Sequence, residues 1–178
     1  VNAPGGSLNG MRLAGDSFLQ VAGHTRFVAG QIGADAAPFQ PGGASYNPAV
    51  GAGVTAWNGL GNSRADLQSL EIIAQQANSR AYLHSGGGIG PQVHVAGATT
   101  LKTMARNSTA MQVDAAASAT STAVIAMGSS DRPQPTAGLY QIRLGEQANV
   151  LAEGQDSIGV HVRNSGTADG RLQLDIVD

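Results

Sequence analysis

From Gln92 onward, apolar and polar residues alternate along the chain in short runs. A period of two is typical of strands that bury one face, and residues such as Asn107 and Gly145 favour turns between the runs. We expect strands at 92–96, 99–105, 110–114, 121–127, 139–144, 157–162 and 171–177. Because no helical pattern separates these runs, we expect antiparallel pairing. The pattern predicts a mainly β body over 92–178, built as an antiparallel β-sandwich or a jelly-roll-like barrel.

The last two of these runs predict a hairpin at the end of the sequence. Their apolar positions fall on one face of each strand: Ile158, Val160, Val162, Leu172, Leu174 and Ile176. Their polar positions fall on the other face: His161, Arg163, Arg171, Gln173 and Asp175. The pattern therefore indicates one buried face and one face for solvent or a partner.

Residues 63–85 have a different period and predict one internal α-helix. Ser63 is a suitable N-cap, and Asp66 three residues later forms a variant of the capping box. An apolar stripe follows at helical spacing: Leu67, Leu70, Ile73, Ala74, Ala77 and Ala81. Glycines and Pro91 end this helix, so residues 86–91 are interpreted as a Gly-rich hinge.

Residues 1–62 predict a long Gly/Pro-rich arm, since they hold 13 of the 25 glycines. Two extended segments, 17–21 and 25–32, would form a short hairpin. The remainder has no sustained period, yet apolar residues recur along it, and an apolar arm needs a surface to lie on. We therefore expect four residues to anchor the arm to a neighbouring copy: Phe39, Tyr46, Val54 and Trp57. No repeat of fixed length is visible in the chain, which argues against a solenoid.

The composition narrows the classes of partner. Charged residues make up 12% of the chain, the net charge is −2 and Lys102 is the single lysine. Binding to phosphate backbones through charge needs clustered positive side chains, so we expect no nucleic-acid partner. No apolar run approaches the ~18 residues of a membrane helix, and we expect no membrane partner. The chain has no cysteine, hence no disulfide or thiolate metal site. It begins at Val1 rather than Met, which leaves removal of an initiator or a longer leader open.

Motifs for catalysis are missing from the sequence. The four histidines, which are His24, His84, His94 and His161, lack metal-motif spacing. No Gly-x-Ser-x-Gly elbow occurs, and the glycine run at 86–90 follows a predicted helix instead of opening one, contrary to a phosphate-binding loop. The triplet at 107–109 matches a glycosylation acceptor, which matters in a secretory context alone. We expect no catalytic, cofactor-binding or metal-binding residues and no enzymatic activity. An enzyme would require a pocket in which His94 or His161 faces a carboxylate.

An apolar arm, a compact β body and low charge together indicate a subunit whose exposed surfaces are covered by neighbours. This layout resembles the small structural proteins of tailed-phage virions, such as capsid decoration (cement) proteins, minor capsid proteins and tail components. The resemblance implies a non-enzymatic subunit located in a virion. Its expected partners are copies of itself, as a trimer or a larger assembly, and a major capsid protein.

A second resemblance is confined to the end of the sequence. The stretch GVHVRNSGTADGRLQLDIV resembles the hairpin of bacterial immunoglobulin-like adhesion modules. This alternative implies a secreted or cell-surface module that binds glycans or proteins. Trp57 and Tyr140 would then be the candidate aromatic platforms for a ligand.

Overall fold

The computed structural model describes residues 2–3, 9–30, 54–86, 90–116, 122–128, 139–145, 147–166 and 170–176. Within these residues the regular secondary structure consists of strands alone. The mainly β prediction is therefore confirmed, and the predicted internal helix is wrong. The strands are β1 (Asn2–Ala3), β2 (Asn9–Leu13), β3 (Phe18–Ala29), β4 (Thr55–Leu60), β5 (Arg64–Ala74), β6 (Arg80–Gly86), β7 (Gly90–Val95), β8 (Thr99–Thr103), β9 (Thr109–Ala115), β10 (Thr122–Met127), β11 (Leu139–Leu144), β12 (Ala148–Ala152), β13 (Ile158–Asn164) and β14 (Arg171–Ile176).

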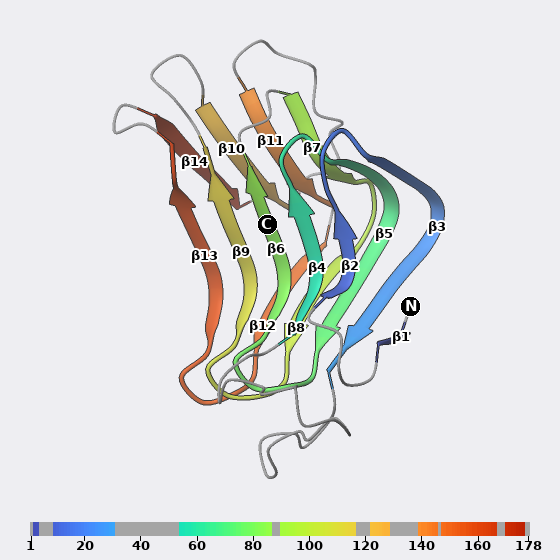
Figure 1. Ribbon diagram of the computed structural model, residues 1–178, viewed down its shortest axis with the longest axis vertical. Coiled ribbons are helices and arrows are strands. Elements are labelled where there is room, and N and C mark those ends of the chain that lie inside the picture. Colours follow the sequence, from blue (N-terminus) through green and yellow to red (C-terminus); the bar gives the residue numbers. More distant parts are fainter. Residues whose placement is uncertain are drawn as a thin grey trace, which may run out of the picture.

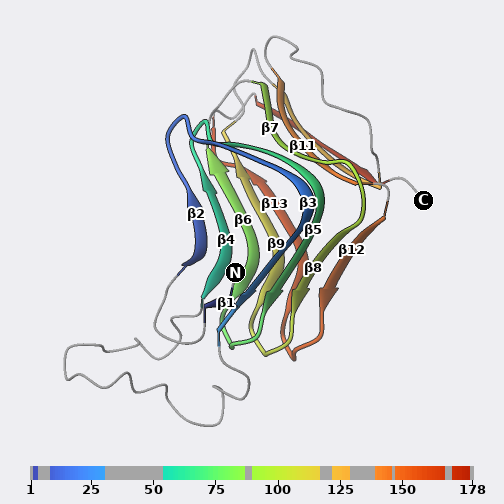
Figure 2. The same cartoon turned by 90° about the vertical axis from the view of Figure 1, so that its right-hand side faces the viewer.

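The described strands pair in parallel, which overturns the expected antiparallel sandwich or barrel. Five strands form the front sheet in the order β2-β4-β6-β9-β13, and Figure 1 shows them side by side from right to left. A second sheet lies behind it and has two branches. The upper branch runs β3-β5-β7-β11-β10-β14, and the lower branch continues from β5 to β8 and β12. Figure 2 shows that β3 and β5 bend, so that the first part of each strand lies in the upper branch and the second part in the lower branch.

The chain therefore winds as a parallel β-solenoid, in which each turn, or rung, stacks on the one before it. The rungs are β2–β3, β4–β5, β6–β7–β8, β9–β10–β11–β12 and β13–β14. The fourth rung has an additional strand, since β10 lies between β11 and β14 while β11 pairs with β7. The expectation that the chain does not form a solenoid was wrong.

A repeated corner precedes the front strands of the third, fourth and fifth rungs. Asn78, Asn107 and Asp156 have positive φ angles of 57°, 53° and 55°, a conformation that Asn and Asp tolerate better than most residues. A serine follows each of them: Ser79, Ser108 and Ser157. The backbone N–H of Val54 donates to Ser79 Oγ at 3.0 Å. The N–H groups of Ser79 and Ser108 likewise donate to the hydroxyl of the next serine, each at 3.1 Å. This serine ladder ties successive rungs together.

One register position on all five front strands holds a small residue, and a larger apolar residue follows it on each strand. The small residues are Gly10, Ala56, Ala81, Ala110 and Gly159. The larger residues are Met11, Trp57, Tyr82, Met111 and Val160, and they pack into the core. A Cβ added to Gly10 would lie 2.7 Å from the Ala56 carbonyl oxygen, so the first rung requires glycine at this position.

The segment predicted as a helix forms β5 and β6. On β5 the core side chains are Ala65, Leu67, Leu70, Ile72 and Ala74. These positions alternate with a period of two, except that the phase shifts where the strand bends at Gln68 and Ser69. The shift puts Leu67 and Leu70 three positions apart, a spacing that imitates a helical stripe. Ser63 is not an N-cap; its hydroxyl accepts the backbone N–H of Leu60 at 3.1 Å and closes a turn.

Both predicted hairpins are also wrong. The segments 17–21 and 25–32 fall largely within one strand, β3, which pairs with β5 in parallel and has an irregularity between Val21 and His24. At the end of the sequence, β13 pairs with β9 and β14 pairs with β10. The predicted buried face holds in part: Val160, Val162 and Leu172 pack against the core, whereas Ile158, Leu174 and Ile176 are 48%, 41% and 67% exposed.

Candidate functional site

The residues predicted to anchor an arm lie in two places. Phe39 and Tyr46 are outside the described residues, so their interface role stays a prediction. Val54 is 4% exposed and Trp57 is 0% exposed, both within the core of their own chain. The Trp57 ring stacks on Tyr82 with centroids 5.9 Å apart and meets Phe27 edge-on at 5.7 Å. Intramolecular packing therefore occupies Trp57, which also removes it as an exposed platform for a ligand.

His84 is a fully buried titratable side chain of the core. Its ring lies near that of Tyr82 and directly beside Gly59 on the neighbouring rung. Burial penalises the charged imidazolium and lowers the pKa of His84 to about 4. His84 is therefore neutral at pH 7 and serves as a core residue.

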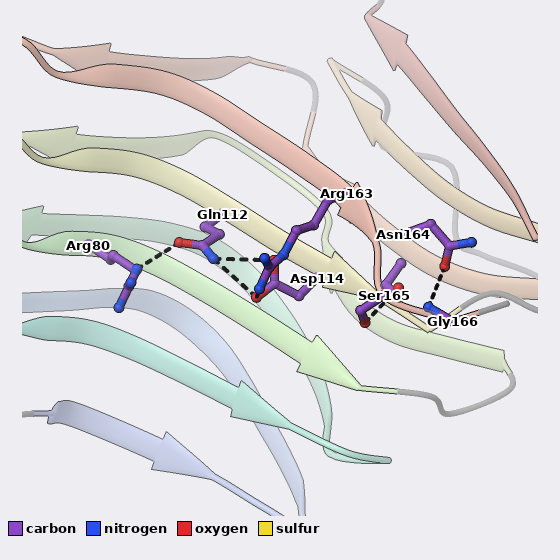
Figure 3. A network of polar contacts seen from close by, with 8 residues as sticks. Arg80, Gln112, Asp114, Arg163, Asn164, Ser165 and Gly166 are labelled. Carbon is purple, nitrogen blue, oxygen red and sulfur yellow. Dashed lines mark hydrogen bonds and ion pairs between the residues drawn. The ribbon is translucent and has the colours of Figure 1, made fainter. Parts of the chain in front are cut away.

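A ladder of polar side chains crosses the outer face of the front sheet over β6, β9 and β13 (Figure 3). Arg80 Nε donates to Gln112 Oε1 at 2.6 Å, and Gln112 Nε2 donates to both Asp114 oxygens at 3.2 and 3.0 Å. Arg163 binds the same carboxylate in a bidentate manner, through Nε at 2.6 Å and Nη2 at 3.0 Å. Each contact joins or orients neighbouring strands, so the ladder fixes the register of three rungs.

Electrostatics in this ladder favour the ionised carboxylate. Burial alone would raise the pKa of Asp114, but the hydrogen bonds from Arg163 and Gln112, together with the positive charge of Arg163 and a smaller effect of His161, lower it below its ordinary value. The carboxylate has its hydrogen-bond partners within the ladder. Its arrangement is that of a structural ion pair and not that of a general base.

A histidine–carboxylate pair lies on the back of the molecule. His94 Nδ1 on β7 is 2.9 Å from Asp66 Oδ1 on β5, and both side chains are mostly buried. His161 lies on β13 in the other sheet, so the two histidines do not meet across strands. His94 thus has the nearby carboxylate that an enzyme would need, but the pair is not part of the surface hollow described next.

The hollow has a volume of about 460 Å³ and is lined by Asp16, Phe18, Asn62 and Arg64. These residues come from two equivalent turns, GDSF at 15–18 and GNSR at 61–64, which stack on one another. Gly15 and Gly61 have the same positive φ of 66°, and Phe18 and Arg64 are register partners. Asn62 Nδ2 donates to Asp16 Oδ1 at 3.2 Å.

The opposite end of the solenoid exposes apolar side chains. We define the terminal edge as the exposed large apolar residues of β12, β13 and β14: Leu151, Ile158, Leu174 and Ile176. Leu174 is 41% exposed although its register partner Ile125 is fully buried. Ile176 is 67% exposed beside Met127, which is 6% exposed. Among the described strands, β12, β13 and β14 each pair on one side alone.

The described residues contain no group of three His, Asp or Glu side chains that could hold a metal ion. Over the same residues, no helix has the length and apolar character needed to cross a membrane. Comparisons with protein-family models, curated proteins and solved structures found no significant match.

Sequence reasoning missed both the hollow and the terminal edge. The hollow had a signal, since Gly15-Asp16-Ser17 and Gly61-Asn62-Ser63 are similar triplets at the ends of apolar runs. The terminal edge had none, because Leu174 and Ile176 alternate like any core-facing pair. Their exposure depends on which strand lies beside β14, and a single sequence does not contain that information.

Proposed function

We propose that the protein is a non-enzymatic structural subunit that self-associates through the terminal edge. The exposure of Leu174 and Ile176 is the observation that supports this most strongly, because both belong to columns that are buried on the preceding strands. An apolar strand edge with free N–H and C=O groups is a site for pairing with another chain, and natural proteins cover or pair such edges.

A second copy of the chain is the partner that we propose for this edge. Each copy presents the same apolar strands, and identical patches can pair across a symmetry axis in a closed assembly. Low overall charge supports close approach between copies, since few like charges would oppose one another across the interface.

We further propose a virion as the setting, with the chain acting as a decoration, cement or minor capsid component that contacts copies of itself and a major capsid protein. The low charge of the chain, its many strands and the lack of catalytic motifs in its sequence support this setting. The immunoglobulin-like alternative rested on a terminal antiparallel hairpin. In the structure β13 pairs in parallel with β9 and β14 pairs in parallel with β10, which removes that basis.

Light scattering coupled to size exclusion tests the proposal. The intact chain should elute well above its monomer mass of 17.9 kDa, as a trimer or a larger assembly. The double variant Leu174→Ser/Ile176→Ser should shift towards the monomer without losing its circular dichroism spectrum. Met104→Ser is the matched control, since Met104 is 41% exposed but lies outside the terminal edge.

A monomer at all accessible concentrations would contradict self-association. Equal dissociation by the Met104 variant would contradict the terminal edge as its site. Electron microscopy of native particles tests the virion setting separately, because a virion component must appear at a fixed position in the particle.

A further inference from the structure

The stacked turns at 15–18 and 61–64 form a surface that the structural role does not require. At the beginning of β3 the side chains of Leu19 and Val21 pack against the core, whereas Phe18 is 60% exposed. An exposed phenylalanine ring contributes little to the fold and leaves about 100 Å² or more of apolar surface in water. Its position in a hollow, and not on a flat surface, indicates a surface on which a ligand can stack.

The three polar residues around this ring complement one another. The Asp16 carboxylate accepts hydrogen bonds, the Arg64 guanidinium donates them in a planar fork, and the Asn62 amide does both. One negative and one positive side chain leave the hollow without net charge. A strongly anionic or cationic ligand would gain one favourable contact and suffer one unfavourable one, so this set favours a neutral ligand with both donors and acceptors.

We propose that this hollow binds a neutral saccharide. A sugar ring has an apolar C–H face that can stack on the Phe18 ring and a rim of hydroxyls, each of which donates and accepts. Adjacent hydroxyls fit the acceptor of Asp16 and the donors of Arg64 in the same hollow, while Asn62 Nδ2 donates to Asp16 Oδ1 at 3.2 Å and holds that carboxylate in place. This combination of an apolar surface and a few convergent polar groups is typical of small-ligand sites.

The stacking of the two turns also suits a chain of sugar units. Equivalent atoms on adjacent rungs are about 4.8 Å apart, so Phe18 and Arg64 lie next to one another along the direction in which the rungs stack. A linear oligosaccharide lying in that direction contacts both turns with successive units. The hollow is open to solvent, and we expect weak, millimolar binding by a single copy that several linked copies would strengthen.

This proposal does not depend on self-association, and its test is independent. A ¹⁵N-labelled sample is titrated with neutral tetrasaccharides of glucose, galactose and N-acetylglucosamine. At least one should shift the amide signals of 15–18 and 61–64. Phe18→Ala should weaken that binding by about tenfold or more, because stacking on the ring supplies most of the apolar contact.

Asp16→Ala serves as the second variant, because it leaves the ring in place and removes the acceptor for the sugar hydroxyls. It should also weaken binding, whereas Met104→Ala, a distant exposed residue, should leave binding unchanged. The proposal is overturned if no saccharide shifts these signals, or if Phe18→Ala and Asp16→Ala bind as well as the intact chain. Asp16 and Phe18 are exposed, so neither substitution should disturb the fold. Retained dispersion of the amide signals will check that both variants are folded.

Discussion

Gly59 and His84 show how closely single residues are matched in the core of this solenoid. They are register partners on β4 and β6, and the imidazole occupies the space that a side chain at Gly59 would need. A Cβ built at Gly59 would lie 2.5 Å from His84 Nδ1 and 2.8 Å from Cε1. The polar ring is thus accommodated by a glycine on the adjacent rung, and neither residue is free to change alone.

Substitution of this glycine is the first prediction. Gly59→Ala should lower the free energy of unfolding by about 1–3 kcal/mol, because the added methyl group forces the buried ring to move. Urea denaturation followed by circular dichroism measures the change. Gly159→Ala is the matched control, since nothing lies within 4 Å of a Cβ there. If the two variants lost equal stability, the contact with His84 would not be the cause.

The buried imidazole also predicts a pH dependence. The unfolded chain binds a proton at His84 below pH about 6.5, whereas the folded chain resists until about pH 4. Acidification from 6.5 to 4 therefore favours the unfolded state, by about 1.4 kcal/mol per pH unit and about 3 kcal/mol in total, and the effect levels off below pH 4. Above pH 6.5 this residue contributes no pH dependence.

Denaturation midpoints of the intact chain and of His84→Leu, measured between pH 7.5 and about pH 4, isolate this effect. The stability difference between the two proteins should change over that range in favour of the variant at acidic pH. Asp114, whose pKa is lowered, loses its stabilising charge only at more acidic pH. Parallel pH profiles for the two proteins would show that His84 is not the group responsible.

At the scale of the element, the corner that precedes β6, β9 and β13 is the repeated unit. The sequence Asn-Ser occurs at 78–79 and 107–108, and Asp-Ser at 156–157. Asn or Asp supplies the positive φ, and the serine hydroxyl accepts the N–H of the rung before it. Each Oγ also donates to a carbonyl of its own corner, as Ser108 does to Arg106 at 3.1 Å. Side-chain hydrogen bonds thus continue the ladder where the chain turns.

Removal of one of these hydroxyls gives the third prediction. Ser108 is 1% exposed, and Ser108→Ala would leave the buried N–H of Ser79 without its acceptor. We expect a loss of about 1–3 kcal/mol in the free energy of unfolding. Ser17→Ala is the control, because the Ser17 hydroxyl is buried and has no hydrogen-bond partner among the described residues, so its removal should be neutral or stabilising. Equal losses in both variants would contradict the ladder as a source of stability.

The elements themselves could be predicted where one phase of alternation lasts for a whole strand. The runs predicted at 99–105, 110–114, 121–127 and 139–144 correspond to β8, β9, β10 and β11. The prediction failed at β5, where the bend at Gln68 and Ser69 shifts the phase and imitates a helix. Alternation also reports which face is buried but not the direction of the neighbouring strand, so β13 and β14 were correctly placed and wrongly paired.

For the whole molecule, unequal rung lengths concealed the solenoid. Serine-ladder partners are 25 residues apart between Val54 and Ser79, 29 between Ser79 and Ser108, and 49 between Ser108 and Ser157. A search for a fixed period cannot align these intervals, although the corner is similar in each. The surface features are still less visible in sequence, since the terminal edge and the hollow are made by neighbours that stacking brings together.

A stack of rungs is close to one-dimensional, which leads to the last prediction. The fifth rung has a neighbour on one side alone among the described strands, so β13 and β14 should open locally, whereas β6 and β9 open with the whole molecule. In dilute protein, the amides of β13 and β14 should therefore be less protected from hydrogen exchange than those of β6 and β9.

If the terminal edge is a contact between copies, raising the protein concentration should increase the protection of β13 and β14 and leave that of β6 unchanged, because association stabilises only the strands that it covers. Uniform protection across β6, β9 and β13 at low concentration would show instead that the rungs unfold as one unit. Exchange in β13 and β14 that did not depend on concentration would separate this local opening from any association of copies.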